Sequence, residues 1–181
     1  ARTMYERAKK EKVKFYSEVS PQELNGLCAA AELIVDAVYG IGFHGETDGV
    51  TAPALAAANA SGAYRVAIDL PSGTECDSAR AASVCFAADE TLTFSTAKPV
   101  HWHMPSERQC GRVTVLSLGI PDAVLQQQPV QAWIPDEAWA KRVFPQRPAD
   151  SNKGSFGKAL CVCGSYGMAG AAMLAASAAL R

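Results

Sequence analysis

Two short apolar runs, separated by a helix-length segment, constrain the fold of this chain more than any other feature. Residues Leu33–Val38 are apolar apart from Asp36, and Arg65–Leu70 form a second run of this kind. Between them lies a helical pattern, Ala52–Asn59. Continuous apolar runs of this length are typical of parallel strands buried on both faces. We therefore expect a βαβ unit, whose functional loops follow the carboxyl ends of the strands.

Further segments extend this unit on both sides. A helical pattern covers Pro21–Ala31, with proline in the first turn, and Val13–Tyr16 are apolar and β-prone. Two more strands are predicted at Thr91–Phe94 and Val113–Leu118. Residues 1–126 are therefore predicted to form half of a Rossmann-like, doubly wound α/β fold around a parallel sheet.

The character of the chain changes after residue 126. Polar residues and several prolines mark 127–150 as a linker, interrupted by one short helix at Asp136–Val143. In residues 151–181 we expect a second α/β unit. Its elements are predicted as follows: a strand at Ala159–Cys163, a turn at Gly164–Gly167 and a helix that runs to Leu180.

The composition excludes several classes of function. Hydrophobic residues make up 49% and charged residues 19% of the chain, as in globular proteins with a core. The net charge of −1 gives no general attraction to nucleic acid or to an anionic membrane, so neither is expected as a partner. The six cysteines form no CxxC pair, which favours reduced thiols in the cytoplasm, and Cys161 and Cys163 are predicted to be core residues. No signal peptide is recognised, and the run Ala169–Leu180 is too short to span a bilayer. The sequence therefore predicts a cytoplasmic protein that acts on small molecules.

A glycine pattern follows the first strand. Residues Gly40–Gly45 match G-x-G-x-x-G, and Asp69 follows at the end of the next strand, as in a dinucleotide-binding fold. However, the helical pattern resumes only after Val50, whereas a dinucleotide loop places its last glycine inside the helix. An NAD-dependent dehydrogenase with a Rossmann loop at 40–45 is therefore kept as the less favoured alternative.

Two acids and a hydroxyl follow neighbouring strands. Asp36 lies near the end of a buried strand, where an ionised carboxylate needs a partner or a cation. Asp69 and Ser72 lie on a proline- and glycine-containing turn after the next strand. We expect Asp36, Asp69 and Ser72 to meet in one crevice. The alternatives are an aspartate that braces a loop and a plain turn at the strand end.

Four other polar side chains have two interpretations each. His101 and His103 could be metal ligands, but no third ligand has suitable spacing, so a loop packed on the core is favoured. His44 is either a substrate contact or an exposed loop residue. Lys98 either meets a phosphate or extends its ammonium group into solvent.

Two groups of separated motifs occur in a fixed order along the chain. The first group is Val35–Ala37, Gly40, Gly42, Asp69–Gly73, Ala88–Asp89, Thr91, Thr93–Phe94, Lys98–Pro99 and Cys110–Gly111. The second is Asn152–Gly157, Gly164–Ser165 and Gly167–Ala171. The first group resembles the latter half of the NAD(P)H-hydrate epimerase domain. The second resembles the start of the ADP- or ATP-dependent NAD(P)H-hydrate dehydratase.

The first resemblance implies a three-layer α/β fold that interconverts the R and S forms of hydrated NADH or NADPH and binds potassium. On this basis Asp36 and Ser72 resemble the potassium ligands, and oxygen ligands suit such a cation. Asp69 resembles the acid that contacts the substrate, and we assign proton transfer to it. The substrate-binding loop is expected at Gly40, Ile41, Gly42, Phe43, His44, Gly45 and Glu46.

The second resemblance implies the start of a ribokinase-like domain that uses ADP or ATP to dehydrate the S form. The family's asparagine- and glycine-rich loop would precede Ala1, and the dehydratase's catalytic aspartate would follow Arg181. We therefore expect a chain cut at both ends and inactive by itself.

The chain also departs from the epimerase family at two positions. Ile41 replaces a usual threonine, and Ala79 replaces a frequent glycine, which puts the conformation of its loop in question. A non-catalytic binding module on the same fold is the rival function, and a homo-oligomer is a possible state.

Overall fold

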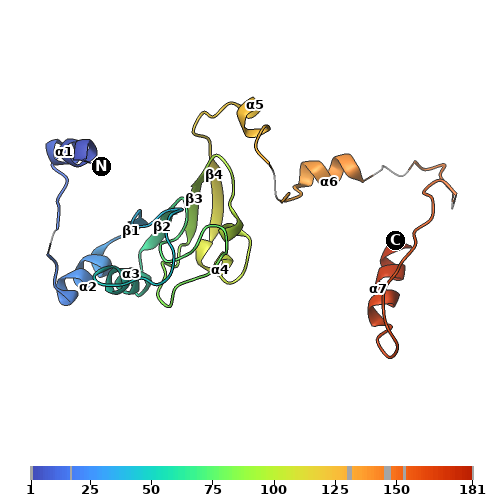
Figure 1. The fold of residues 1–181 in the computed structure, drawn as a ribbon, viewed down its shortest axis with the longest axis horizontal. Helices are drawn as coiled ribbons and strands as arrows, with labels where there is room; N and C mark the ends of the chain where they lie inside the picture. The colour runs from blue at the N-terminus through green and yellow to red at the C-terminus, as the bar shows by residue number, and fades with distance from the viewer. Residues whose placement is uncertain (1, 17, 130–131, 145–147, 153, 181) are drawn as a thin grey trace. The chain divides into compact units, whose positions relative to one another are not determined.

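The structure is a computed structural model that describes residues 2–16, 18–129, 132–144, 148–152 and 154–180. The chain divides into two units, Ala1–Gln128 and Pro129–Arg181. Figure 1 labels their helices and strands.

The first unit is built on a sheet of four parallel strands, in the order β1-β2-β3-β4. The strands are β1 (Leu33–Asp36), β2 (Tyr64–Ile68), β3 (Glu90–Phe94) and β4 (Arg112–Leu116). Helix α3 (Thr51–Asn59) connects β1 to β2, which confirms the predicted βαβ unit. The four predicted strands and the Rossmann-like α/β class are therefore confirmed, although β1, β2 and β4 end two residues earlier than predicted.

Short helices and loops make up the rest of the described part of this unit. Helix α2 (Pro21–Ala30) begins as the sequence predicts, because the Ser20 side chain accepts a hydrogen bond from the backbone N–H of Glu23 and proline occupies the first turn. The β-prone run Val13–Tyr16 belongs to no strand. The other helices are α1 (Arg2–Lys10), the 3-10 helix η1 (Pro99–His101), α4 (Glu107–Cys110) and α5 (Asp122–Leu125).

The core of this unit lies on one face of the sheet. Leu55 and Ala58 of α3 pack with Ala67 of β2, Phe86 and partly buried Ile34 of β1. Helix α2 lies beside α3 (Figure 1). A second, smaller cluster lies beyond the end of β2 and consists of Leu70, Cys76 and Val100.

The prediction that β1 is buried on both faces is wrong. Asp36 is 3% exposed, whereas Leu33 and Val35, whose side chains point to the other face, are more than half exposed. The reason is that β1 lies at the edge of the sheet and α3 covers one face only. The three-layer arrangement that the family resemblance implies stays a prediction.

The described residues of the second unit include two helices, α6 (Glu137–Val143) and α7 (Gly170–Ala179). Helix α6 confirms the predicted short helix, because the Asp136 side chain accepts a hydrogen bond from the backbone N–H of Trp139 and caps its start. The predicted turn at 164–167 is confirmed by a bridge between Ser165 and Met168.

The predicted strand Ala159–Cys163 is absent from the second unit. No described segment of this unit offers a partner strand, and Leu160 and Val162 are each 90% exposed. The prediction that Cys161 and Cys163 are core residues is wrong for the same reason, since both are exposed. The start of a ribokinase-like domain therefore stays a prediction. None of the described helices has the length and apolar character needed to cross a bilayer.

Candidate active site at the carboxyl edge of the sheet

The carboxyl ends of the first three strands carry the polar side chains of the candidate site. Asp36 is the last residue of β1, Asp69 follows β2 directly, and Thr93 and Phe94 end β3. Because all strands are parallel, these residues lie at one edge of the sheet, as the sequence predicts. They form two separate clusters, one around Asp36 and one around Asp69. No hydrogen bond among the described residues joins the Asp69 side chain to Asp36 or Ser72, so of the three residues predicted to share one crevice only Asp36 and Ser72 are in contact.

The first cluster pairs a buried carboxylate with a buried hydroxyl. Ser72, which is fully buried, donates from its hydroxyl to Oδ1 of Asp36 (2.6 Å) and from its backbone N–H to Oδ2 (2.7 Å). Tyr39 donates its N–H to the Ser72 hydroxyl (2.9 Å), and Val38 donates its N–H to Asp36 (3.2 Å). The predicted pair Asp36 and Ser72 therefore lies within hydrogen-bonding distance.

The donors to Asp36 are all neutral. No described lysine, arginine or histidine forms an ion pair with this carboxylate. A buried carboxylate without a cationic partner is costly, and its remaining lone pairs favour a cation. The donor set of Asp36 and Ser72 consists of oxygen only, which suits potassium.

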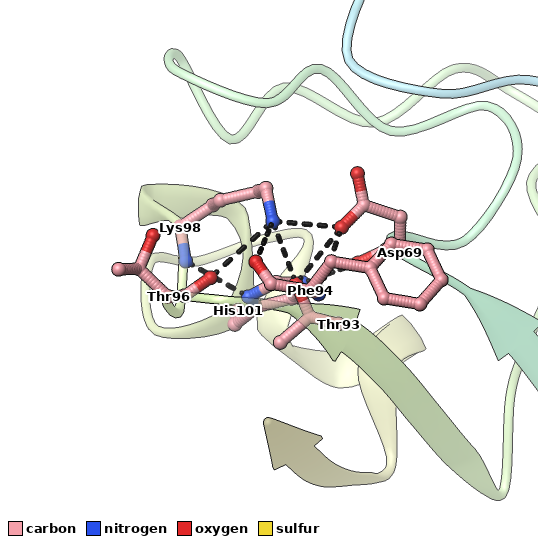
Figure 2. A network of polar contacts seen from close by, with 6 residues as sticks. All are labelled: Asp69, Thr93, Phe94, Thr96, Lys98 and His101. Atoms are coloured by element: carbon pink, nitrogen blue, oxygen red, sulfur yellow. Dashed lines mark hydrogen bonds and ion pairs between the residues drawn. The ribbon is translucent and has the colours of Figure 1, made fainter. Parts of the chain in front are cut away.

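The second cluster joins Asp69 to Lys98, a pairing that the sequence did not predict (Figure 2). Oδ1 of Asp69 accepts hydrogen bonds from the Lys98 ammonium (2.7 Å), the Thr93 hydroxyl (3.0 Å) and the Phe94 N–H (3.3 Å). The Lys98 ammonium also donates to the Thr93 hydroxyl (2.8 Å) and to the carbonyls of Phe94 and Thr96 (both 3.3 Å). The Lys98 ammonium therefore does not extend into solvent, and its contact with a phosphate stays a prediction.

This network sets the charge of Asp69. Partial burial acts to raise the pKa of the Asp69 carboxyl, but the hydrogen bonds from Lys98, Phe94 and Thr93 outweigh it, and the pKa lies below its ordinary value. Asp69 is thus a carboxylate at neutral pH. Its second oxygen, Oδ2, accepts no hydrogen bond from a described residue and points away from the network (Figure 2).

His101 fixes the backbone at the same position. Its Nδ1 accepts the backbone N–H of Lys98 (3.0 Å), so the proton of the neutral ring is on Nε2, which donates to the carbonyl of Asp69 (2.9 Å). Burial lowers the pKa of His101, which keeps the ring neutral. Asp69 has a φ of 71°, a left-handed conformation that is costly outside glycine and needs such support.

The favoured interpretation of His101 and His103 as part of a loop packed on the core is confirmed for His101, which is 1% exposed, but not for His103, which is exposed. The described residues contain no group of three or more histidine, cysteine, aspartate or glutamate side chains able to hold a metal ion. The sequence carries one general signal, because Lys98 and His101 both follow β3, whose carboxyl end lies at the same edge of the sheet as Asp69, but no local pattern pairs them.

The predicted substrate loop borders an open hollow of about 380 Å³. At Gly40 and Gly42 a side chain would meet no atom within 4 Å, and neither residue has a positive φ, so neither crowding nor backbone conformation requires glycine there. The bare backbone leaves room for a bound group to approach closely. The residues that line the hollow are Val38, Tyr39, Gly40, Gly42, Phe43, His44 and Glu46.

Contacts on both sides hold this loop. Phe43 is largely buried and its ring lies 4.8 Å from that of Tyr39. Oε2 of Glu46 accepts two hydrogen bonds of 2.7 Å, from the N–H and the hydroxyl of Ser83. Glu75 accepts the N–H of Gly45 (3.0 Å). The segment between β2 and β3 therefore ties down the far end of the loop.

Two loop residues remain exposed. The His44 side chain is 74% exposed and lies 3.9 Å from Glu75, and Ile41 is 61% exposed. Both residues therefore lie on the surface of the loop, and their contact with the substrate stays a prediction.

The loop that contains Ala79 has the backbone conformation expected of the glycine that alanine replaces. Its φ is 54°, so alanine adopts the left-handed conformation that glycine favours. The residue is fully buried, and the Ser106 hydroxyl donates to its carbonyl (2.7 Å). The loop therefore keeps a glycine-type conformation, with local strain at one alanine.

The dehydrogenase alternative does not fit this geometry. Helix α3 begins at Thr51, after a turn at residues 49–50, whereas Gly45 lies well before it. The last glycine of the pattern is therefore outside the helix, and a pyrophosphate bound at the glycines would not meet the helix N-terminus.

Comparisons with known proteins agree on one family. A model of the family described as YjeF-related protein N-terminus matches residues 1–100. The chain is 38% identical over 151 residues to the bifunctional NAD(P)H-hydrate repair enzyme Nnr of Moorella thermoacetica, covering 83% of this chain and 28% of that protein. It is 40% identical over 99 residues to the NAD(P)H-hydrate epimerase of Pirellula staleyi, covering 55% of this chain and 44% of that protein. The chain thus spans less than half the length of these relatives.

Proposed function

Because this chain belongs to the family described as YjeF-related protein N-terminus, we propose that it carries part of the active site of an NAD(P)H-hydrate epimerase. Such an enzyme interconverts the R and S forms of NADH hydrate and NADPH hydrate. The observation that carries the proposal is the carboxyl edge of the sheet, where a carboxylate with one free oxygen, Asp69, follows the strand beside that of Asp36.

In the proposed reaction Asp69 exchanges a proton with the substrate. The hydrated ring carries a hydroxyl on C6, the carbon beside the ring nitrogen, and inversion at C6 needs a group that moves a proton near that hydroxyl. Oδ2 of Asp69 is available for this step, since Oδ1 is held by Lys98, Thr93 and Phe94. A proton-transferring side chain typically accelerates a reaction by about a hundred- to ten-thousand-fold.

The proposed potassium ligands on this chain are Asp36 and Ser72. A bound potassium ion would supply positive charge to the buried carboxylate and fix the ends of the two loops that follow β1 and β2. The residues Gly40–Glu46, which begin in the first of these loops, are proposed to bind the substrate along their exposed glycine backbone.

A second activity, dehydration of the S form with ADP or ATP, is favoured by the length of the matches. The bifunctional Nnr of Moorella thermoacetica matches over 151 residues, whereas the epimerase of Pirellula staleyi matches over 99. The longer match reaches beyond what the single-function relative shares with this chain. We propose that residues 151–181 begin the dehydratase domain.

The epimerase proposal is tested with the protein at its full natural length. Pure R hydrate of NADH is added, and formation of the S form is followed by a separate S-specific dehydratase. We expect inversion well above the uncatalysed rate, with NADPH hydrate tested in parallel. Calorimetric titration with the hydrate is the second measurement, because binding without faster inversion would establish the binding module and reject the epimerase.

A further inference from the structure

The state of Asp69 before the reaction selects between two chemical routes for the proposed epimerisation. In one route the C6 hydroxyl leaves as water and a new water adds to the opposite face. In the other the ring opens between C6 and the nitrogen and closes again on the opposite face. The first route must begin with a proton donated to the hydroxyl, and the second with a proton removed from it.

The described groups around Asp69 favour removal. The carboxylate oxygen Oδ1 accepts the Lys98 ammonium at 2.7 Å together with two neutral donors, so the resting side chain is an anion. Its free oxygen, Oδ2, carries no proton and can only accept one at the start.

The neighbouring side chains of this network offer no proton in its place. The three hydrogens of the Lys98 ammonium face Asp69, Thr93 and the carbonyls of Phe94 and Thr96. The Nε2 hydrogen of His101 is bonded to the Asp69 carbonyl, and the ring is 1% exposed. Protonation of the leaving hydroxyl would therefore require the ion pair to break first.

We propose that Asp69, held as a carboxylate by Lys98, acts first as a base and that the epimerisation proceeds by ring opening. This inference rests on the proposed function. Oδ2 takes the proton of the C6 hydroxyl, the C–O bond becomes a carbonyl, and the bond between C6 and the ring nitrogen breaks. The nitrogen keeps the electron pair, which is shared with the conjugated carboxamide, and receives the proton from Asp69.

The reverse steps complete the inversion. Rotation about the bond between C5 and C6 presents the other face of the aldehyde, and the nitrogen adds its electron pair to C6. The nitrogen's proton returns through Asp69 to the new hydroxyl. Atoms and electrons balance without an oxidant, a reductant or a water molecule, and the C6 oxygen is the same atom throughout.

The fate of that oxygen is the test. The full-length protein converts R hydrate in water enriched in oxygen-18, and the S product is analysed by mass spectrometry at early times. A sample without enzyme, incubated for the same time, gives the background exchange. Ring opening predicts that label stays at this background, because C6 keeps its oxygen. Loss and re-addition predicts one labelled oxygen for each inversion, since the leaving and the entering water lie on opposite faces.

The outcomes separate the two proposals. Inversion with one labelled oxygen per event would overturn the ring-opening inference and leave the epimerase function standing. No inversion above the uncatalysed rate would reject the epimerase function itself. Unlabelled product formed at an enzymatic rate supports both.

Discussion

The two edges of the sheet use carboxylates in opposite ways. At the amino edge Asp89 and Glu90 each meet an arginine: Asp89 accepts from the side chain and backbone of Arg65, and Glu90 accepts from Arg112 (2.8 Å). Both oxygens of Asp89 are used, and both of Glu90. These acids connect neighbouring strands, which is a structural task.

At the carboxyl edge both oxygens of Asp36 accept hydrogen bonds, but this carboxylate has no cationic partner among the described residues, and Asp69 accepts hydrogen bonds on one oxygen only. Asp36 is almost fully buried but has neutral donors alone, and Asp69 has a cationic partner on one oxygen and none on the other. A buried carboxylate whose hydrogen-bond donors are all neutral favours a bound cation. A carboxylate oxygen without a hydrogen bond can accept and return a proton. Acids are present at both edges, so an acid by itself does not mark the candidate site. The candidate site differs from the amino edge because its carboxylates lack a cationic partner or a hydrogen bond on one oxygen.

The largest effect is expected from Asp69→Asn, which removes the proton-accepting group and keeps its shape. We expect kcat for inversion to fall by about a hundred- to ten-thousand-fold, because an amide cannot exchange the proton. The fold should survive, since the amide oxygen can still accept from Lys98. The measurements are kcat and KM for R hydrate, together with a melting temperature.

Asp89→Asn is the matched control for this change at the other edge. It should lower the melting temperature, because the pairing with Arg65 weakens, and leave kcat unchanged. If the two variants lost activity equally, the distinction between the edges would be refuted. An Asp69→Asn variant with more than about a tenth of the parental kcat would reject the catalytic role of Asp69.

A smaller effect is expected from Asp36→Ala, measured as stability rather than rate. A ligand that binds only the folded state at a hundred times its Kd stabilises it by about 2.7 kcal/mol. We expect potassium to raise the Tm of the parent protein and to raise that of the variant much less. Sodium at equal ionic strength is the control for general salt effects. Equal potassium-induced shifts in parent and variant would remove Asp36 from the site.

Much of the fold and part of the candidate site could be predicted from the sequence, for physical reasons. Apolar runs and turn residues are local signals, so the strands and the placement of Asp36, Asp69 and Ser72 at one edge follow from them. The Lys98 pairing depends on a side chain 29 residues from Asp69, which no local pattern reports. The strand predicted at Ala159–Cys163 failed because a strand requires a partner, and a pattern cannot supply one.

A third effect is a change of pH dependence in Lys98→Met. The pKa of Asp69 is lowered in the folded protein, although burial acts against this, and Lys98 is the main cause of the lowering. Removing the ammonium should raise that pKa, so the acidic limb of the kcat/KM profile should move to higher pH. His101 and Cys76 also interact with Asp69; burial lowers the pKa of His101 and raises that of Cys76 to about 11. An unmoved limb would show that Lys98 does not set this ionisation.

The amino edge should respond in stability instead. Hydrogen bonds from the Arg65 side chain lower the pKa of Asp89 below its ordinary value of 3.8. A carboxyl group whose pKa is lower in the folded than in the unfolded state stabilises the fold above the unfolded pKa, and loses this as pH falls through the folded value. The difference in Tm between the parent and Asp89→Asn should therefore be present at neutral pH and shrink in strong acid. A difference that persists at the acidic end would exclude the ion pair as its source.

The smallest effect is expected at Ala79, on the segment that follows β2 at the carboxyl edge. Its left-handed backbone, at a φ of 54°, costs an alanine about 1–2 kcal/mol and costs a glycine almost nothing. Ala79→Gly should relieve this strain and so stabilise the folded state. Against it, the variant loses a fully buried methyl group, worth about 0.8 kcal/mol, and gains freedom in the unfolded chain. We therefore expect a change in the free energy of unfolding within about 1 kcal/mol of zero, measured by urea denaturation.

Ala82→Gly is the control, since Ala82 is also buried but does not have a positive φ. This variant should only be destabilised, because it loses a buried methyl group and gains freedom in the unfolded chain without any relief of strain. If both variants were destabilised equally, Ala79 would carry no strain, and the segment would hold its glycine-type turn without cost.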